Sequence, residues 1–249
     1  MLTHAAGKIA TLVFGGRCFL CRGYAADAAD SARVLCAACE RPLAGAPEPR
    51  CPVCALASPG GQVCGRCLSG RPHFDETRCA LDYRFPVDVL VQSLKFRGQL
   101  ALAGLFGRLL HKELGPMSLL TPDLLLPVPL SDVRIRERGY NQSMEIARAL
   151  GVEIARSSPY GSGPRLAPEL CRRTRDTAPQ ADLPWKQRVM NLRDAFACER
   201  TVAGKSIAIL DDVMTTGATL NEVAKALKAA GAVRVVNWVV ARTPASSDR

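Results

Sequence analysis

From about Asp75 onward, short continuous apolar runs alternate with segments in which apolar residues recur every three or four positions. Continuous runs of this kind are typical of strands buried on both faces, and the wider spacing is typical of amphipathic helices. The pattern predicts strands over 124–126, 207–210 and 233–240. It predicts helices over 141–150 and 220–227, which end at Gly151 and Gly231. The alternation indicates an α/β domain over 75–249, with a mostly parallel sheet flanked by helices.

Residues 1–74 have a different pattern, with few large apolar residues and many Gly, Pro and Ala. Their cysteines come in CxxC pairs, a spacing that lets two thiolates face one tetrahedral metal ion. Because this segment has little apolar surface to bury, we expect metal to supply its folding energy. It is predicted to be a small double zinc-ribbon module with two structural zinc sites, whose ligands are Cys18, Cys21, Cys36, Cys39, Cys51, Cys54, Cys64 and Cys67.

The CxxC pairs can share two metal ions in two ways. Either the first two pairs form one site and the last two the other, or the pairs are crossed, with the first and third sharing a metal. Disulfides are the alternative to zinc, but they need an exporting context. The apolar stretch from Ile9 to Phe14 is too short for a signal sequence and is expected to be a short helix. No apolar run is long enough to span a bilayer, so we expect no membrane insertion and a cytoplasmic location.

Four other residues could be taken for metal ligands. His73 lies near the second cysteine group, but four cysteines are already available there, and a surface or packing role is expected. Cys79, Cys171 and Cys198 have no CxxC partner and are expected to be ordinary small buried residues.

The charge of the chain is strongly basic, since 33 Lys and Arg against 23 Asp and Glu give 33 − 23 = +10. A surplus of this size favours polyanionic partners, either phosphate-rich metabolites or nucleic acid. A basic surface that only confers solubility is the alternative.

The candidate chemistry lies at the carboxyl ends of the predicted strands, where ligands of parallel sheets bind. The strand over 207–210 is followed by Asp211 and Asp212, and then by a Thr- and Gly-rich loop that leads into a helix. Hydroxyl groups, a glycine and the unpaired N–H groups of a helix start form a cradle for one phosphate. Two carboxylates would repel that phosphate, and a better role for them is to accept hydrogen bonds from sugar hydroxyls, directly or through Mg²⁺. Neighbouring residues point to opposite sides of a strand, so the two are not expected to share one role.

The stretch from Asp211 to Thr219 resembles the signature of type I phosphoribosyltransferases, which bind phosphoribosyl diphosphate (PRPP). The resemblance implies that Asp211 and Asp212 are catalytic and face the ribose 2′- and 3′-hydroxyls. It implies that the 5′-phosphate is held by Thr215, Thr216, Gly217, Ala218 and Thr219.

Basic residues follow the first predicted strand and the loop 127–130. Guanidinium groups suit phosphate through their paired donors. We therefore expect the pyrophosphate to be held by Arg134, Arg136 and Arg138, with Arg138 also catalytic. A second basic stretch over 172–177, followed by Gln180, Arg188 and Asn191, is predicted to be either a mobile flap or a solvated charged loop.

The chain as a whole resembles the ComF family, including competence protein ComF and the GntX-like proteins. The resemblance runs in order through the CxxC pairs, Leu94–Gly98, Pro127–Leu130, Arg138–Ser143, Arg173–Asn191 and the PRPP loop. It implies a zinc-ribbon module fused to a phosphoribosyltransferase-like domain. It also implies a link to natural transformation and DNA uptake, with competence proteins as partners.

Two hypotheses follow for the function. In the first, the chain is an enzyme that binds Mg²⁺ and PRPP, and an unidentified acceptor displaces pyrophosphate. In the second, it is a non-catalytic protein that holds single-stranded DNA in a basic cleft and on the zinc ribbons. Base stacking would then fall to Tyr140 and Trp185, because Trp238 lies in a predicted strand and suits the core better.

Overall fold

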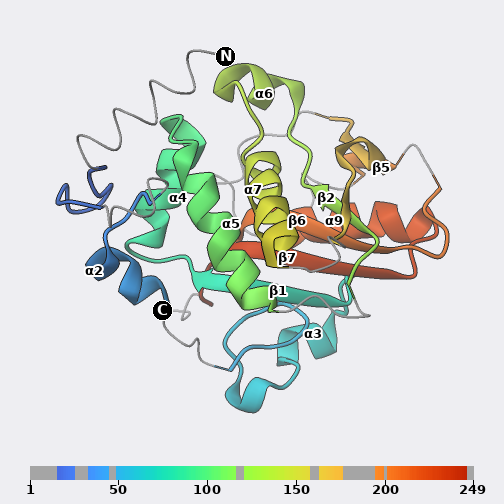
Figure 1. Ribbon diagram of the computed structural model, residues 1–249. Coiled ribbons are helices and arrows are strands. Elements are labelled where there is room, and N and C mark those ends of the chain that lie inside the picture. Colours follow the sequence, from blue (N-terminus) through green and yellow to red (C-terminus); the bar gives the residue numbers. More distant parts are fainter. Residues whose placement is uncertain are drawn as a thin grey trace.

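A five-stranded parallel sheet forms the centre of the molecule (Figure 1). The structure is a computed structural model, and it describes residues 16–25, 33–44, 49–115, 121–157, 163–175, 194–198 and 201–245. The sheet has the order β1-β7-β6-β2-β3. Its strands are β1 (Glu76–Asp82), β2 (Leu124–Pro127), β3 (Arg165–Leu166), β6 (Ser206–Met214) and β7 (Arg234–Arg242). The predicted α/β class with a mostly parallel sheet is therefore confirmed.

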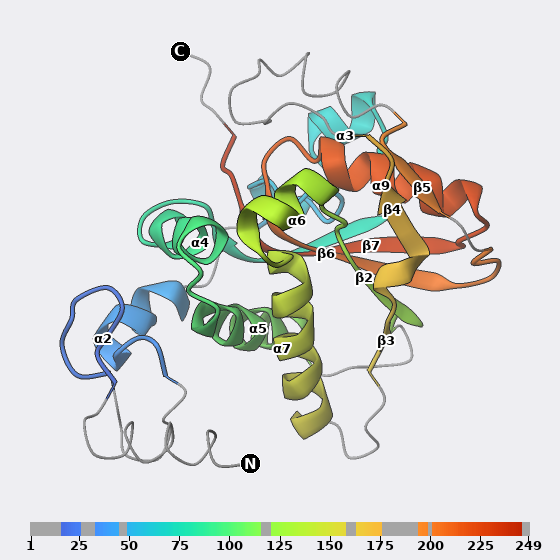
Figure 2. The same ribbon diagram turned by 90° about the horizontal axis from the view of Figure 1, so that it is seen from above.

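Helices cover both faces of this sheet (Figures 1 and 2). One face carries α4 (Val87–Phe96), α5 (Ala101–Leu114) and α7 (Gln142–Ser157), and the other carries α9 (Ala218–Ala229). Successive side chains of each strand point to opposite faces of the sheet. In β6, Ala208 and Leu210 join the core under α5 and α7, while Ile207 and Ile209 join the core under α9.

Shorter elements complete the fold. A separate antiparallel pair is formed by β4 (Cys171–Arg173) and β5 (Phe196–Cys198). The short helices are α2 (Ala37–Glu40), α3 (Gly65–Ser69) and α6 (Asp132–Arg138), and 3-10 turns cover Arg41–Ala44, Pro59–Gly61 and Pro168–Leu170.

Two of the predicted elements extend at least four residues beyond their expected ends. The strand expected over 207–210 continues through both aspartates to Met214, because β7 pairs with it along its whole length. The helix expected over 141–150 does not stop at Gly151 but runs on to Ser157. Ile154 continues the apolar spacing of the helix and is buried. Its burial outweighs the cost of about 1 kcal/mol for a glycine inside a helix.

The two cysteine-rich ribbons pack against different faces of the sheet. Cys18, Leu35 and Leu43 of the first ribbon share a core with α4 and α5, and α2 lies beside these helices in Figures 1 and 2. Cys51 and Cys67 of the second ribbon share the core under α9. The predicted boundary at residue 74 falls between α3 and β1. The predicted short helix at Ile9–Phe14 lies outside the described residues.

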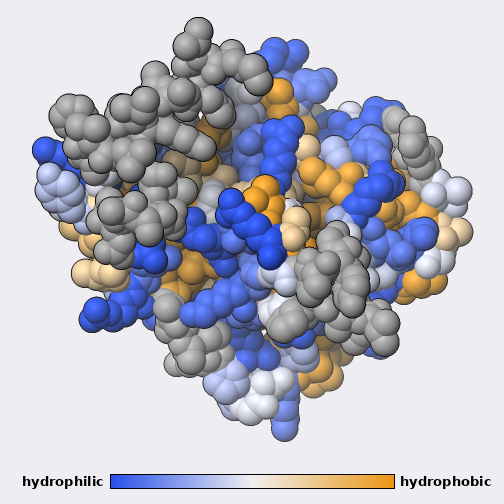
Figure 3. Space-filling model, viewed as in Figure 1, coloured by the Kyte–Doolittle hydropathy of each residue, from blue (hydrophilic) through white to orange (hydrophobic). Residues whose placement is uncertain are grey.

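The outer surface mixes hydrophilic and apolar groups. On the side seen in Figure 1, the space-filling view shows hydrophilic residues interspersed with small apolar groups (Figure 3). Within the described residues, the structure contains no helix with the length and apolar character needed to cross a membrane.

Candidate functional site

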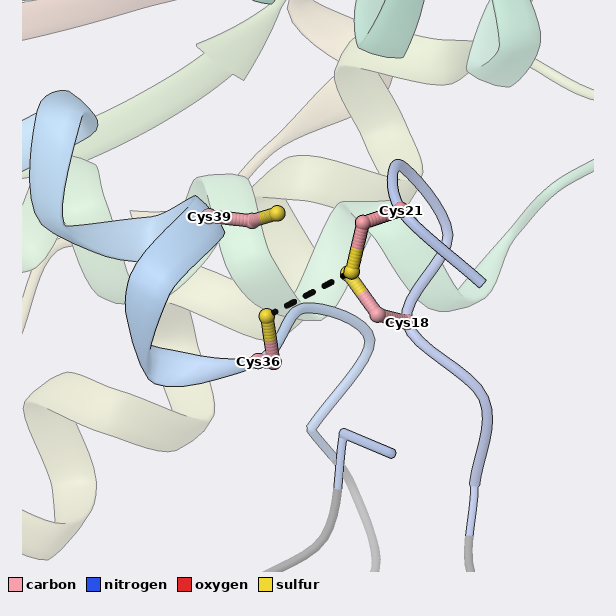
Figure 4. Close-up of side chains that lie close together, drawn as sticks. All are labelled: Cys18, Cys21, Cys36 and Cys39. Atoms are coloured by element: carbon pink, nitrogen blue, oxygen red, sulfur yellow. Dashed lines mark hydrogen bonds between the residues drawn. The ribbon is translucent and has the colours of Figure 1, made fainter. Parts of the chain in front are cut away.

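The first four CxxC cysteines lie together in sequence order. Cys18 and Cys21 come from a loop, and Cys36 and Cys39 come from the start of α2 (Figure 4). Their sulfur atoms all lie within 4.8 Å of one another, and the Sγ atoms of Cys21 and Cys36 are 3.7 Å apart. Because the first and second CxxC pairs share one cluster, the structure favours the sequential pairing over the crossed one.

The second cluster repeats this design. Its loop pair is Cys51 and Cys54, and its helix pair starts at Cys64, the N-cap of α3. In both ribbons the residue after the loop pair has a left-handed backbone, with φ 64° at Arg22 and 56° at Ala55. Its N–H donates to the carbonyl of the first cysteine of the pair, at 2.9 and 2.8 Å. The two ribbons are thus structural repeats of each other.

Each cluster contains one thiol that gives up its proton readily. Burial alone would raise the pKa of Cys18, but backbone N–H groups of Cys21, Cys36 and Leu20 lower it to about 6. A hydrogen bond from its neighbour Cys36 raises the pKa of Cys39 to about 12. A divalent metal displaces such shared protons, and four thiol ligands with no open position suit structural zinc. The double zinc ribbon predicted from the sequence is confirmed, with two four-cysteine clusters.

Asp212 lies on the buried side of β6, close to the carboxyl end of the strand. It is only 2% exposed, and its Oδ1 accepts an ion pair from Lys95 Nζ of α4 at 3.0 Å. Although burial alone would lower it, the carboxylates of Asp212 and Asp211 raise the pKa of Lys95 above its ordinary value. Asp212 Oδ2 is buried and has no hydrogen-bond partner among the described residues.

Asp211 has different neighbours. Its Oδ1 accepts the hydroxyl of Ser143 at 3.1 Å and the backbone N–H of Asp212 at 2.9 Å. Burial, followed by the adjacent charge of Asp212, raises the pKa of Asp211 to about 7. The two carboxylates therefore differ in their partners, which is what their opposite orientation on the strand predicts.

The loop between β6 and α9 has the shape of a phosphate cradle. Gly217 has φ 83°, a left-handed backbone that favours glycine. A Cβ atom there would also come within 2.6 Å of Met214 Cε, but this is the end of a flexible side chain that can move. Gly217 is the N-cap of α9, and the Thr216 hydroxyl accepts the N–H of Ala218 at 3.2 Å. The unpaired N–H groups and the dipole at a helix start attract an anion. A small cavity of about 30 Å³ is lined by Asp211 and residues 213–220.

The three arginines predicted to hold pyrophosphate occupy different positions on α6. Burial lowers the pKa of the Arg138 guanidinium, and the charge of Asp212 opposes this shift. The guanidinium donates to Gln142 Oε1 at 2.9 Å and lies 5.0 Å from the centre of the Phe96 ring. Arg134 pairs with Glu137 at 3.6 Å, and Arg136 is exposed. Of the three, Arg138 is the one that feels the charge of Asp212, and the pyrophosphate role of all three stays a prediction.

Only part of the predicted flap lies in the described region. Arg173 of β4 lies 5.8 Å from the centre of the Phe196 ring of β5, so the antiparallel pair forms the base of the segment. Gln180, Arg188 and Asn191 lie outside the described residues.

The remaining histidine and cysteines occupy structural positions. His73 is not part of either cysteine cluster; its backbone N–H donates to Asn221 Oδ1 at 2.8 Å. Cys79 and Cys171 are buried as expected, whereas Cys198 is only partly buried and lies opposite Cys171 in the β4–β5 pair.

Three residues of the site were not predicted individually. Lys95 lies in Leu94–Gly98, and Ser143 lies in Arg138–Ser143. Both segments resemble the ComF family, but no function was predicted for either residue. Arg242 at the end of β7 donates to the carbonyl groups of the cradle loop. Only Lys95 and Ser143 had a signal that could have found them, because both stand in short segments that resemble the family.

Comparison with known proteins supports these observations. Residues 105–249 match the family described as "Phosphoribosyl transferase domain", and residues 9–68 match the "Double zinc ribbon domain". DNA utilization protein YhgH of Escherichia coli O157:H7 is 34% identical over 237 residues, which cover 93% of this chain and 99% of that protein. Competence protein F of Haemophilus influenzae is 31% identical, covering 92% and 98%. Competence protein ComFC of Streptococcus pneumoniae is 25% identical, covering 84% and 87%.

Proposed function

The chain belongs to the ComF family, and from this premise we propose that it binds PRPP with Mg²⁺ and transfers the phosphoribosyl group, with release of pyrophosphate, in a process linked to DNA utilization. The relatives YhgH and competence protein F carry names that refer to DNA utilization and competence.

The observation that carries the proposal is the meeting of four groups at the carboxyl ends of the parallel strands. Asp211 and Asp212 stand on β6, Lys95 reaches Asp212 from α4, and Arg138 at the end of α6 is near enough to interact electrostatically with Asp212. The cradle loop follows directly in the chain. Carboxylates for a sugar, cations for a diphosphate and a helix start for a phosphate are the groups that PRPP requires.

We assign the roles as follows. The cradle loop 215–219 holds the 5′-phosphate, and Asp211 and Asp212 accept hydrogen bonds from the ribose hydroxyls. In the transfer, the bond between the anomeric carbon and the pyrophosphate oxygen breaks, and pyrophosphate leaves with the electron pair. The acceptor nucleophile forms the new bond to that carbon. When bound, Mg²⁺ would neutralise phosphate charge through oxygen ligands.

Lys95 and Arg138 contribute positive charge to the proposed PRPP site. Two carboxylates next to a diphosphate raise the energy of the complex, and Lys95, 3.0 Å from Asp212, offsets one of these charges. Arg138 is partly buried, lies over the Phe96 ring and interacts electrostatically with the same carboxylate. Both cations stabilise the charge that develops on departing pyrophosphate. Arg134 and Arg136 are assigned to the outer end of the diphosphate.

Calorimetric titration with PRPP tests the proposal. The zinc-loaded protein is titrated with and without Mg²⁺, beside the double variant Asp211→Asn/Asp212→Asn. We expect Mg²⁺-dependent binding in the wild type and its loss in the variant. The matched control is Asp75→Asn/Asp123→Asn. These exposed carboxylates lie just before the amino ends of β1 and β2, whereas the proposed site lies at the carboxyl ends of the strands. This control should bind PRPP like the wild type.

The outcomes separate binding from turnover. Retained binding in the Asp211/Asp212 variant, or equal loss in the control, would contradict the assigned site. Where wild-type binding is found, release of pyrophosphate is measured across free bases, nucleotides and DNA. Binding without release from any acceptor would contradict the transferase activity and leave a PRPP-binding protein.

A second candidate function, holding single-stranded DNA, is favoured by the names of the relatives and by the net charge of +10. Of its predicted stacking residues, Trp238 is buried in β7 at 4% exposure and is therefore unsuitable. Tyr140 is partly buried and donates to the carbonyl of Leu94, while Trp185 lies outside the described residues. Exposed Tyr24 and Phe85, at 80% and 78%, offer better stacking surfaces.

Fluorescence anisotropy of a labelled single strand at two salt concentrations tests this second function. Binding through phosphate contacts should weaken by at least about tenfold between 50 and 200 mM salt. Binding that is insensitive to salt, or absent at low salt, would contradict it. In either function we expect the protein to act in the cytoplasm beside proteins of DNA uptake.

A further inference from the structure

The cradle loop is supported from behind by the second ribbon. Arg242, the last residue of β7, is only 2% exposed, and its guanidinium reaches both structures. Its Nε donates to the carbonyl of Cys54 at 2.9 Å. The same guanidinium donates to the carbonyl of Met214 at 2.8 Å and to that of Thr215. One buried side chain therefore joins a cysteine of the second cluster to the start of the loop.

Two further contacts join the same pieces. Arg66 of α3 donates to the carbonyl of Thr216 at 3.1 Å. The backbone N–H of His73, just after the ribbon, donates to Asn221 in the first turns of α9 at 2.8 Å. A cavity of about 440 Å³ lies beside these contacts, between α3 and the start of α9. Hydrogen bonds thus bridge the open space that separates the ribbon from the loop.

These contacts fix the direction of the loop amides. In a planar trans peptide the carbonyl of one residue and the N–H of the next point in opposite directions. The arginines hold the carbonyls of Thr215 and Thr216 toward the ribbon, and Arg242 shares the carbonyl of Met214 with the backbone N–H of Thr243. The N–H groups of Thr216 and Gly217 consequently point away from the ribbon.

The buried charge of Arg242 needs a counter-charge. Among the described residues no carboxylate forms an ion pair with it, and its hydrogen-bond partners are backbone carbonyls. A buried guanidinium without compensation is costly. A divalent ion on four thiolates carries 2 − 4 = −2 charges. This cluster, of which Cys54 is a member, supplies the missing negative charge when it is loaded with metal.

We propose that Arg242 is a positioning residue of the phosphate loop and that the metal–thiolate cluster of Cys51, Cys54, Cys64 and Cys67 is its counter-ion. Metal in the second ribbon then sets the shape of the loop, whereas metal in the first ribbon does not. The inference rests on the proposed function insofar as the loop 215–219 is taken to hold the 5′-phosphate. The second ribbon therefore supports the loop that binds the 5′-phosphate of PRPP.

Hydrogen exchange of the two amides that are bonded to loop atoms, those of Ala218 and Asn221, tests the inference in the full-length protein without any ligand. The decisive pair is Cys64→Ser and Cys36→Ser, because both residues are partly exposed N-caps of short helices and each belongs to one cluster. Metal analysis should show that each variant loses one of two zinc ions. We expect protection of these two amides to fall at least tenfold in Cys64→Ser and to stay unchanged in Cys36→Ser. Equal loss in both, or no loss in Cys64→Ser, would overturn the proposal.

A second set of variants separates Arg242 from general damage to the ribbon. Arg242→Met should keep both zinc ions and still lose loop protection. Should that variant not fold, Arg66→Met removes the exposed contact to Thr216 and should lower the protection of the Ala218 amide, which is bonded to Thr216, by a smaller factor. Unchanged loop protection in a folded, zinc-loaded Arg242→Met would contradict the positioning role.

PRPP titration of the same variants keeps the two proposals distinguishable. Wild type that binds no PRPP, but shows the expected exchange pattern, overturns the proposed function and leaves this inference intact. Wild type that binds PRPP, with an unchanged affinity in Cys64→Ser, overturns this inference and leaves the proposed function intact.

Discussion

At the scale of single residues, Asp211 and Asp212 are adjacent in sequence but differ in their surroundings. Asp212 is paired with Lys95, while Asp211 is destabilised by burial and by the charge of its neighbour. A buried carboxylate with a cation beside it stabilises the fold in its charged form, and one beside a second carboxylate destabilises it. The two positions should therefore respond in opposite ways to the same substitution.

Replacing Asp211 with Asn should stabilise the protein at neutral and higher pH. The pKa of Asp211 is raised from 3.8 to about 7, so the folded chain holds this proton more tightly than the unfolded chain. Its contribution to the free energy of unfolding is fully present below about pH 4 and is lost as the pH rises through 7. At pH 8, Asp211→Asn should raise the free energy of unfolding by at least about 1 kcal/mol. Urea unfolding across pH 4–8 measures this, and an unchanged pH dependence would contradict it.

Replacing Asp212 with Asn should destabilise the protein under the same conditions. Lys95 would keep its charge in a site where the side chain is only 22% exposed, with its closest carboxylate gone. Removing one member of such a pair leaves a poorly compensated charge, and we expect a loss of about 2 kcal/mol. The double variant Lys95→Met/Asp212→Asn removes both charges and should recover part of the loss. Equal stability of the single and double variants would argue against the ion pair.

At the scale of elements, the contact between α5 and α7 depends on one glycine. A Cβ atom at Gly107 would lie 2.9 Å from backbone and side-chain atoms of Ala149 and from the nitrogen of Leu150. The two helices can approach closely there only because Gly107 has no side chain. At Gly104, in the same helix, a Cβ atom would have open space around it, with no atom of the described residues within 4 Å.

The two glycines therefore provide a matched test of helix packing. Gly107→Ala should lower the free energy of unfolding by about 1–3 kcal/mol, because backbone has to shift to admit the methyl group. Gly104→Ala should raise it by up to about 1 kcal/mol through helix propensity alone. Both are measured by urea unfolding monitored by circular dichroism. A stabilised Gly107→Ala would mean that the two helices have room between them for a methyl group.

Most of the central elements were predictable because their apolar runs are local. β2, β6, β7 and α9 follow from continuous or periodic apolar residues and from the loop between them. The far end of β6 was not predictable, since its aspartates are in a strand only because β7 pairs with them. Lys95 could not be assigned for a related reason. Its partner Asp212 is distant in the sequence, and only the packing of α4 against the sheet brings them together.

At the scale of the whole molecule, the ribbons and the sheet share their apolar cores. Cys18, Leu35 and Leu43 belong to the core under α4 and α5, and Cys51 and Cys67 belong to the core under α9. Elements that share a core unfold together in a cooperative transition. Loss of the ribbons is therefore expected to affect both faces of the sheet.

Removing zinc with a chelator should lower the thermal midpoint of the entire chain. We expect one calorimetric transition, shifted down by roughly 10 °C, because metal binding to such clusters contributes directly to folding energy. Restoring zinc should return the midpoint, and an equal amount of Mg²⁺ should not. A transition of the sheet domain at an unchanged temperature, beside a separate early loss of the ribbons, would show that the two parts are independent.

The place of β7 in the sheet has a consequence for how the protein is made. β7 is the last strand in chain order, yet it lies between β1 and β6, and Asn237 bonds Thr77 across 160 residues. β1 therefore has no strand partner until β7 has left the ribosome. Pairing between strands that are distant in sequence is slow, and apolar surface stays exposed until it occurs. Arg242 arrives with the same strand. The support of the phosphate loop is therefore among the last features to form during synthesis, and we expect newly made chains to depend on chaperones until then.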